Sequence, residues 1–214
     1  MRNILRTVVT AMTLVAIVCS MSARQPAMSE KQQEQARKSI VKEARKQARQ
    51  KEKEGWRVEQ TGLMETVIAE HREKLTIRGL EERIGTADSF KSRSLARTQC
   101  LNNAVKEYAT EVSGVIKGKM VSSDVSNDDA ARQAENFKGD FEQRMAAELA
   151  GELRISYSLY RKNPDGTYDM EVYYVVDPEG AHSAKLRAAK YAAELAQLDA
   201  QWVEEITRSI DDND

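Results

Sequence analysis

The sequence predicts an α+β domain in which a long helix packs on a small antiparallel sheet, flanked by long N- and C-terminal helices. Residues 153–176 alternate apolar and polar side chains on both sides of an Asn163–Gly166 turn, which is the pattern of a β-hairpin. Residues 88–118 repeat apolar side chains every three or four positions, as a helix with one buried face does. Because these are the two largest apolar faces, we expect them to cover each other.

The composition indicates one modest domain. The chain has 214 residues, of which 41% are hydrophobic and 31% charged, and its formal net charge is −1. A balanced charge gives no indication of nucleic acid as a partner. Residues 1–23 are richer in apolar side chains than the rest of the chain, whose thinly spread hydrophobic positions argue against a large enzyme core with a deep pocket.

Residues 1–23 have the three-part form of a secretory signal peptide. Basic residues precede an apolar run at 8–18, which is shorter than the about 20 residues that span a membrane. We therefore expect export to the periplasm or the outer membrane, with cleavage between about Ser22 and Arg24. Two of the 33 basic side chains leave with this segment and none of the 34 acidic ones, so the mature net charge is 31 − 34 = −3.

Cys19 raises the alternative of a lipid-anchored lipoprotein. The modified cysteine of such a protein normally follows a small residue, and Val18 stands in that place. The pattern therefore favours removal of Cys19 with the leader. Cys100 is then the single thiol, and no internal disulfide can form.

Residues 24–55 predict a basic N-terminal helix. Ser29 and Gln32 form a capping box, and Gly55 provides a stop. Its net positive charge allows weak contact with an anionic envelope or membrane surface. The absence of a bulky apolar anchor favours a solvated helix along the domain instead. Its apolar line consists of Ala36, Ile40, Ala44 and Ala48.

Residues 56–178 form the α+β domain. We expect a short extended piece at 56–58, a helix at 63–75, and an extended edge segment at 76–87 as a possible third strand. A second amphipathic helix ends near Leu149. The hairpin face predicted to meet the central helix comprises Leu153, Ile155, Tyr157, Leu159, Met170, Val172 and Tyr174.

Residues 179–214 predict one Ala-rich helix, from Glu179 to Ile210, followed by an acidic tail. Its narrow apolar stripe is suited to pack on that of the N-terminal helix. The sheet edge then needs a cover, which is either this chain itself, a second copy or another envelope protein.

The sequence predicts no catalytic residue, no cofactor and no metal site. His71 and His182 are far apart in sequence, and we expect both to be solvated surface residues. Cys100 fits a buried structural thiol better than a nucleophile. The acidic residues at 124–129 lack the pattern of a calcium loop and fit helix capping.

Tyr160 and Tyr173 are the two candidate partner-binding residues. Both are expected on the outer face of the hairpin, where a tyrosine ring can stack on a sugar or a peptide. The preference of tyrosine for strands explains their presence more readily than partner binding does.

The order of elements resembles that of known envelope proteins. The chain joins an exported leader, a basic helix ending in Lys-Glu-Gly-Trp (53–56), and Ile84-Gly85-Thr86-Ala87 before a long helix. In this it resembles uncharacterised exported proteins of Gram-negative bacteria, similar to the small bacterial "lipoprotein twenty" family. The likeness covers about residues 56–177 and the basic helix. The charged residues 81–83 depart from the apolar strand typical of that family.

The resemblance implies a dodecin-like or hot-dog-like α+β arrangement, an envelope location, frequent self-association, and neither an active site nor a cofactor. Two function classes remain. We favour a non-enzymatic binding or structural module of the cell envelope. The alternative is a hydrolase-type enzyme that uses loop carboxylates brought together by folding.

Overall fold

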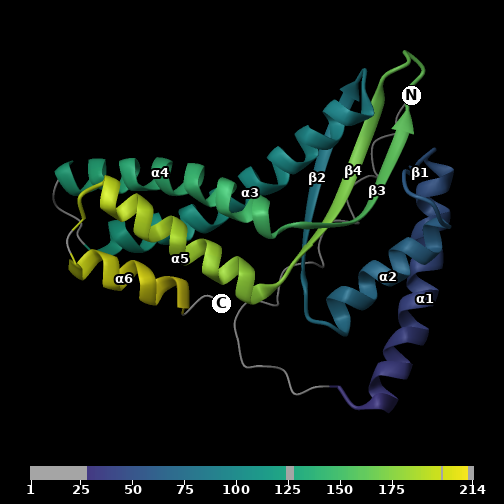
Figure 1. The fold of residues 1–214 in the computed structure, drawn as a ribbon, viewed down its shortest axis with the longest axis horizontal. Helices are drawn as coiled ribbons and strands as arrows, with labels where there is room; N and C mark the ends of the chain where they lie inside the picture. Colours follow the sequence, from purple (N-terminus) through teal and green to yellow (C-terminus); the bar gives the residue numbers. More distant parts are fainter. Residues whose placement is uncertain (1–27, 124–127, 199, 212–214) are drawn as a thin grey trace, which may run out of the picture.

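A computed structural model describes residues 28–123, 128–198 and 200–211 and confirms the α+β class (Figure 1). The expected signal peptide, Cys19 and the end of the acidic tail lie outside the described residues. The described chain forms, in order, α1 (Glu30–Lys53), β1 (Arg57–Val58), α2 (Met64–Thr76), β2 (Glu81–Phe90), α3 (Arg93–Ser123), α4 (Asp128–Glu152), β3 (Arg154–Lys162), β4 (Tyr168–Val176), α5 (Pro178–Leu195) and α6 (Ala200–Asp211).

The strands form one antiparallel sheet in the order β1-β3-β4-β2. β3 and β4 are the predicted hairpin. Its turn places Gly166 at a φ of +84°, which glycine adopts without a Cβ clash. The expected edge segment is confirmed from Glu81 onward, but the strand runs on to Phe90. The central helix therefore begins at Arg93 rather than at Asp88.

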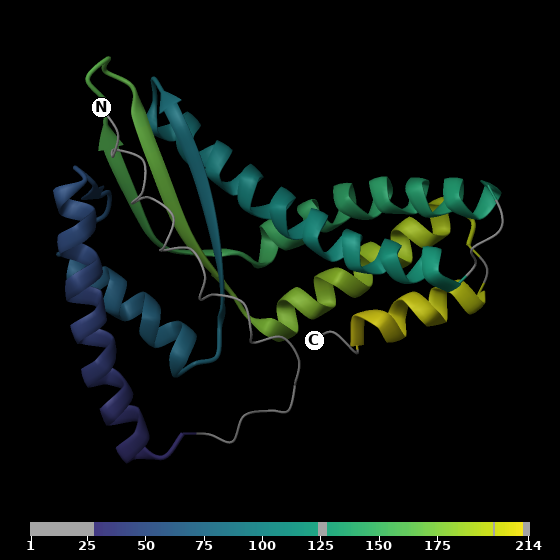
Figure 2. The ribbon, with the colours of Figure 1, turned by 180° about the vertical axis from the view of Figure 1, so that it is seen from behind.

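Helices cover the two faces of the sheet as separate layers (Figure 2). α3 packs on β2 and β4 and continues past the sheet to form a bundle with α4, α5 and α6. α1 and α2 lie over the other face, where α2 contacts β3. The side chains of β4 alternate between the two cores, so Val172 and Tyr174 face α3 while Tyr173 faces α2.

A β-bulge in β3 makes part of the predicted hairpin face wrong. Ile155 pairs with Tyr174, whereas Tyr157 pairs with Tyr173, so Ser156 is an extra residue in β3. An extra residue reverses the alternation of side chains across a strand. Tyr157 and Leu159 therefore lie in the core under α1 and α2 instead of under α3. Ile155 is left 54% exposed.

The C-terminal segment is two helices, so the prediction of one continuous helix is wrong. α5 ends at Leu195, and Gln197 takes a left-handed φ of 52°. The Leu198 N–H donates to the Ala193 carbonyl oxygen (3.0 Å) and the Gln197 N–H to that of Glu194 (3.2 Å). This pair of hydrogen bonds is a Schellman motif, which ends a helix and reverses the chain.

The N-terminal helix has the predicted ends. The Ser29 and Gln32 capping box is present, and Gly55 follows the helix at a φ of +86°. Ile40, Ala44 and Ala48 are its buried side chains. They pack toward α2 rather than toward the C-terminal helices, because α1 and α2 are adjacent while α5 and α6 belong to the bundle. The predicted pairing of the two terminal helices is therefore wrong.

β1 and β2 are the edge strands of the sheet. Asn103 of α3 donates a side-chain hydrogen bond to the Thr86 carbonyl oxygen of β2 (2.8 Å), so part of this strand is satisfied within the chain. Self-association through the sheet edge stays a prediction.

Candidate functional site

The outward face of α1 carries four cations in one line. Lys42, Lys46, Arg49 and Lys53 are all exposed, and we call them the outer cationic row. Their spacing of four, three and four residues keeps them on one side of a helix with 3.6 residues per turn. That side is opposite to Ala44 and Ala48, which are buried toward α2. α1 therefore points the row away from the body of the protein.

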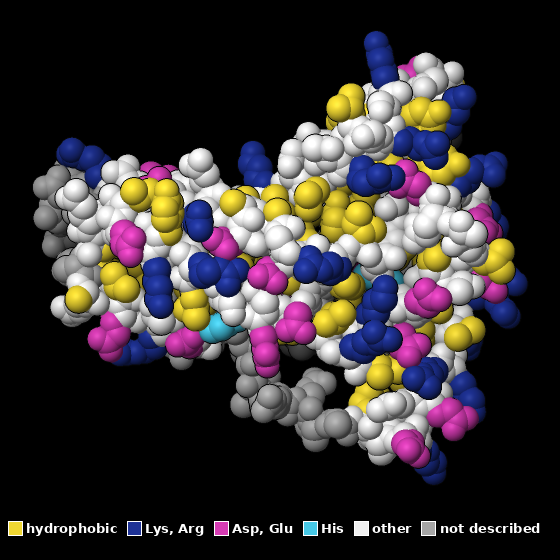
Figure 3. Space-filling model, viewed as in Figure 1, with side chains coloured by type: hydrophobic (Ala, Val, Ile, Leu, Met, Phe, Trp, Pro, Cys, Tyr) yellow, Lys and Arg dark blue, Asp and Glu magenta, His cyan; other side chains and the backbone are white. Residues whose placement is uncertain are grey.

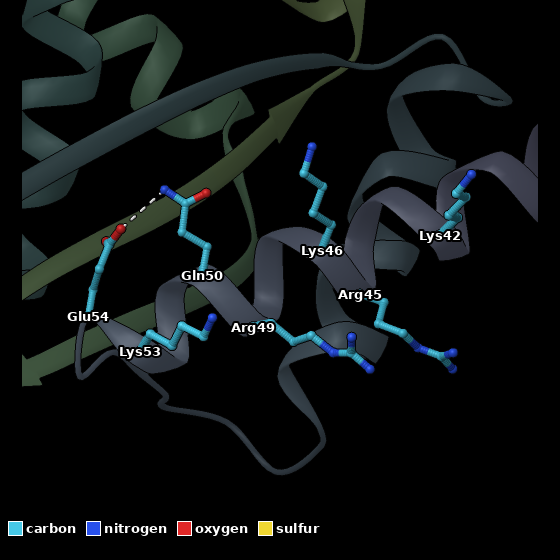
Figure 4. Close-up of a pocket in the computed structure, with 7 residues that line it drawn as sticks. All are labelled: Lys42, Arg45, Lys46, Arg49, Gln50, Lys53 and Glu54. Carbon is cyan, nitrogen blue, oxygen red and sulfur yellow. Dashed lines mark hydrogen bonds between the residues drawn. The ribbon is translucent and has the colours of Figure 1, made fainter. Parts of the chain in front are cut away.

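The outer cationic row borders a shallow hollow of about 670 Å³ on the surface of α1 (Figure 4). Arg45, Gln50 and Glu54 complete its lining, and the Gln50 side-chain amide donates to Glu54 (3.2 Å). Figure 4 shows the Lys and Arg side chains spread apart along the helix. One carboxylate thus faces five cations in this lining, so the hollow is strongly positive.

Ion pairs use the cations beside the row but not the row itself. Arg37 pairs with Glu73 (3.1 Å) and Arg45 with Glu65 (3.2 Å), both across to α2. Among the residues that the structure describes, no carboxylate lies within ion-pair distance of any member of the outer cationic row. The charge of the row is therefore available to a partner.

The inward side of α1 is tied to the sheet by a buried polar cluster, which consists of Lys51, His71, Glu82, Tyr157, Glu171 and Tyr173. The Lys51 ammonium donates to both carboxylate oxygens of Glu171 (2.7 and 2.5 Å) and lies 5.0 Å from the Trp56 ring centroid. The Tyr173 hydroxyl donates to the same carboxylate (2.8 Å). These contacts connect the last turn of α1 directly to β4.

His71 is the least expected member of the buried polar cluster. Only 2% of it is exposed, so the prediction of a solvated surface histidine is wrong. Its Nε2 lies 2.6 Å from Oε1 of Glu82 on β2. The edges of the Tyr157 and Tyr173 rings face the imidazole at centroid distances of 5.2 and 5.8 Å. Its Nδ1 is buried and has no hydrogen-bond partner among the described residues.

The two tyrosines of the cluster stack on each other, with ring centroids 4.2 Å apart and planes 9° apart. Burial raises the pKa of both Tyr157 and Tyr173 well above the ordinary value, and the nearby carboxylates of Glu171 and Glu82 add to the effect. Both hydroxyls thus stay protonated at physiological pH. Tyr173 remains a hydrogen-bond donor to Glu171.

A histidine oriented by a carboxylate can act as a general base through its second nitrogen. In this structure that nitrogen, Nδ1, is buried, and the imidazole packs edge-on against the stacked Tyr157 and Tyr173 rings. The residues lining the hollow on α1 do not include His71. The pair of His71 and Glu82 therefore joins α2 to β2.

The structure does not bring the two sequence-predicted site residues together. Tyr173 is 6% exposed and lies in the buried polar cluster, so the prediction that it faces outward is wrong. Tyr160 is half-buried on the opposite face of the sheet, where its ring packs against Tyr168 and lies 4.9 Å below the Arg93 guanidinium. Their proposed stacking on a sugar or peptide stays a prediction.

The other residues considered for chemistry are a cysteine, a second histidine and the acidic side chains. Cys100 is fully buried, as predicted, and burial raises the pKa of its thiol to about 12. The side chain of His182 is half-buried beside Asp211 (3.4 Å). Within residues 28–123, 128–198 and 200–211, no group of three His, Cys, Asp or Glu side chains is arranged to hold a metal ion. Residues 124–127, considered above for calcium, lie outside the described residues.

A signal for His71 was present in the sequence. Met64, Val67, Ile68 and His71 recur with the spacing of one helical face, and the first three are buried. This spacing places His71 on the buried side of α2. The partner Glu82, by contrast, follows only from the strand register, which local patterns do not determine.

No helix in the part of the chain that the structure describes is long and apolar enough to cross a membrane. Comparison with known proteins adds no relative from which a role can be transferred: no protein-family model matches the chain, and neither the curated proteins nor the solved structures contain a significant match.

Proposed function

We propose that the protein is an exported cell-envelope protein and acts as a non-enzymatic binding module that holds an anionic partner through the outer cationic row. One observation carries this proposal. Four exposed cations that have no ion-pair partner in the described part of the chain lie in line on α1, although the whole chain has a net charge of −1. Charge of one sign gathered on one face attracts a partner of the opposite sign independently of the overall charge.

The buried polar cluster supports the same proposal. Lys51, in the last turn of α1, is held by Glu171 and Trp56. Arg37 and Arg45 form ion pairs with α2. α1 is thus fixed on its inward side along most of its length. A fixed helix presents its cations without the cost of ordering the backbone on binding.

Retention on a cation-exchange column at pH 7 tests the proposal. A protein with net negative charge is retained there only if a local basic surface binds the matrix. We expect retention of the unchanged protein at low salt, and its loss when the row is neutralised as Lys42→Gln, Lys46→Gln, Arg49→Gln and Lys53→Gln. Loss of retention should also follow from raising the salt concentration, since exposed charges are screened.

A matched control separates the row from net charge. Exposed cations away from α1 are Lys106 on α3, Lys190 on α5, and Arg78 and Lys91 in loops. Their replacement by Gln removes the same number of lysines and arginines. This control variant should still be retained on the column. An equal loss of retention in both quadruple variants would contradict the proposal.

Export is tested separately by mass spectrometry of the native protein. We expect an N-terminus between about Ser22 and Arg24. An intact Met1, or a diacylglyceryl group on Cys19, would contradict cleavage by signal peptidase at this position.

A further inference from the structure

The outer cationic row is straight, and α1 is the outermost element on its side of the molecule. Lys42 and Lys53 are eleven residues apart, which corresponds to about 16 Å along a helix. Figures 1 and 2 show α1 at the edge of the fold, with α2 beside part of its length, while its last turn contacts β4. In Figure 3, dark blue Lys and Arg side chains lie along this edge, with magenta Asp and Glu side chains among them. A flat partner can therefore touch the row along its length without meeting another element.

The chemistry of α1 suits phosphate groups and offers little to bases. Binding of single-stranded nucleic acid uses exposed aromatic rings on which bases stack. The aromatic residue nearest the row in sequence is Trp56, which is only 7% exposed and lies beneath Lys51 and Arg161. Lysine and arginine remain as the binding groups, and these pair with phosphate oxygens.

The apolar side chains of α1 limit how deep such contact can go. Val41 is the one large apolar side chain exposed on the described α1, at 51%. Deep interfacial insertion needs several bulky apolar residues along one face. Contact through the row would therefore be peripheral and mainly electrostatic, with an affinity that falls steeply with salt.

From these observations we propose that the partner of the outer cationic row is a flat bilayer surface rich in anionic phospholipid headgroups. This inference rests on the proposed function and names its partner class. α1 would lie parallel to the membrane, with the row against the phosphates and α2 and the sheet behind it. Each cation near such a surface contributes independently, so neutralising four of them should weaken binding by about a hundredfold or more.

Vesicle co-flotation tests the proposal with the full-length mature chain. The probes are vesicles of phosphatidylglycerol and phosphatidylcholine in a 1:2 ratio and vesicles of phosphatidylcholine alone, in buffers of low and moderate salt. We expect binding only to the anionic vesicles at low salt. The quadruple Gln variant of the row should no longer bind the anionic vesicles. The matched variant at Lys91, Lys106, Lys190 and Arg78 should still bind them.

Two half-variants test whether the whole row contacts the vesicle surface. Lys42→Gln with Lys46→Gln, and Arg49→Gln with Lys53→Gln, should each give an intermediate loss if the whole row lies on the surface. Unchanged thermal melting shows that each variant is folded. Complete loss from one pair and none from the other would overturn the extended contact.

Two further arms identify other sources of the same chemistry. Inorganic phosphate that displaces the protein from vesicles far better than sodium chloride of equal ionic strength would indicate a discrete phosphate site and overturn the proposal. So would binding to a DNA duplex without binding to anionic vesicles. If the unchanged protein is retained on the cation exchanger but does not bind anionic vesicles, this inference alone is overturned. If the unchanged protein does neither, the proposed function is overturned as well.

Discussion

His71 on α2 and Glu82 on the edge strand β2 meet at 2.6 Å through Nε2 and Oε1, beneath the layer formed by α1 and α2. The imidazole is buried, and its other nitrogen has no partner among the described residues. A buried polar group that loses its partner costs more than the hydrogen bond itself contributes. The stability of α2 on the sheet should therefore depend on Glu82 more than its partial exposure suggests.

We expect Glu82→Ala to lower the free energy of unfolding by about 1–3 kcal/mol, because it leaves a buried imidazole without any hydrogen bond. Glu81→Ala is the control. Both carboxylates have side chains 37% exposed and are neighbours in sequence, but Glu81 pairs with the partly exposed Arg83. The control should lower the free energy of unfolding by less than about 1 kcal/mol. Urea unfolding at pH 7 measures both, and equal losses would contradict a special role of the His71 contact.

Gly85→Ala should lower the free energy of unfolding by about 3 kcal/mol or more, through overpacking between β2 and α3. A Cβ on Gly85 would lie 1.9 Å from the carbonyl oxygen of Cys100, which is backbone and cannot rotate away. Gly139→Ala on α4 is the opposite case, because its Cβ would meet no heavy atom within 4 Å. We expect that control to be neutral or stabilising by about 0.5–1 kcal/mol. Thermal melting ranks the two variants, and a mild effect at Gly85 would refute the close crossing.

Gln197→Gly should stabilise the protein by about 0.5–1 kcal/mol. Gln197 holds a left-handed φ of 52° in the turn between α5 and α6, a conformation that costs other residues more than glycine. Gln197→Val should destabilise it, since a β-branched side chain tolerates this φ least. Denaturant midpoints compare the three chains. A continuous helix through residue 197 would instead make the chain with Gln the most stable and the chain with Gly the least stable.

The elements that the sequence predicted well are those coded by local patterns. The hairpin follows from alternation around a turn of Asn, Pro, Asp and Gly, and the first helix from the Ser29 and Gln32 box and Gly55. The missed break at Gln197 has no glycine to mark it. Its left-handed conformation is imposed by the packing of α6 back onto the bundle, which is a tertiary effect.

The errors at the candidate site have a related cause. An unforeseen bulge at Ser156 moved Tyr157 to the other face of the sheet, beside Tyr173 and His71. Alternation along the strand cannot show an extra residue, because the bulge is defined by the partner strand. The basic character of α1 was visible in the sequence. The ion pairs that set the outer cationic row apart from Arg37 and Arg45 depend on the position of α2.

Asp169 should make the fold sensitive to acid. Burial by itself would raise its pKa, but Arg161 (2.7 Å), the Ser89 N–H (3.0 Å) and the Asn163 amide (2.8 Å) hold the pKa of this carboxyl below its usual value. A carboxyl whose pKa is lower in the folded than in the unfolded state stabilises the fold fully above the unfolded value, which is about 3.9. This contribution is lost as the pH falls through the folded value.

We therefore expect Asp169→Asn to be less stable than the unchanged protein at pH 7, with a difference that narrows below about pH 4. The amide keeps the size of the side chain but cannot pair as an anion with Arg161. Asp88→Asn is the control, because Asp88 is exposed on the neighbouring strand and should show little difference at any pH. Urea unfolding at pH 7, 5 and 3 measures the difference in free energy of unfolding between each variant and the unchanged protein. A difference that stays constant over this range would show that the charge of Asp169 does not stabilise the hairpin.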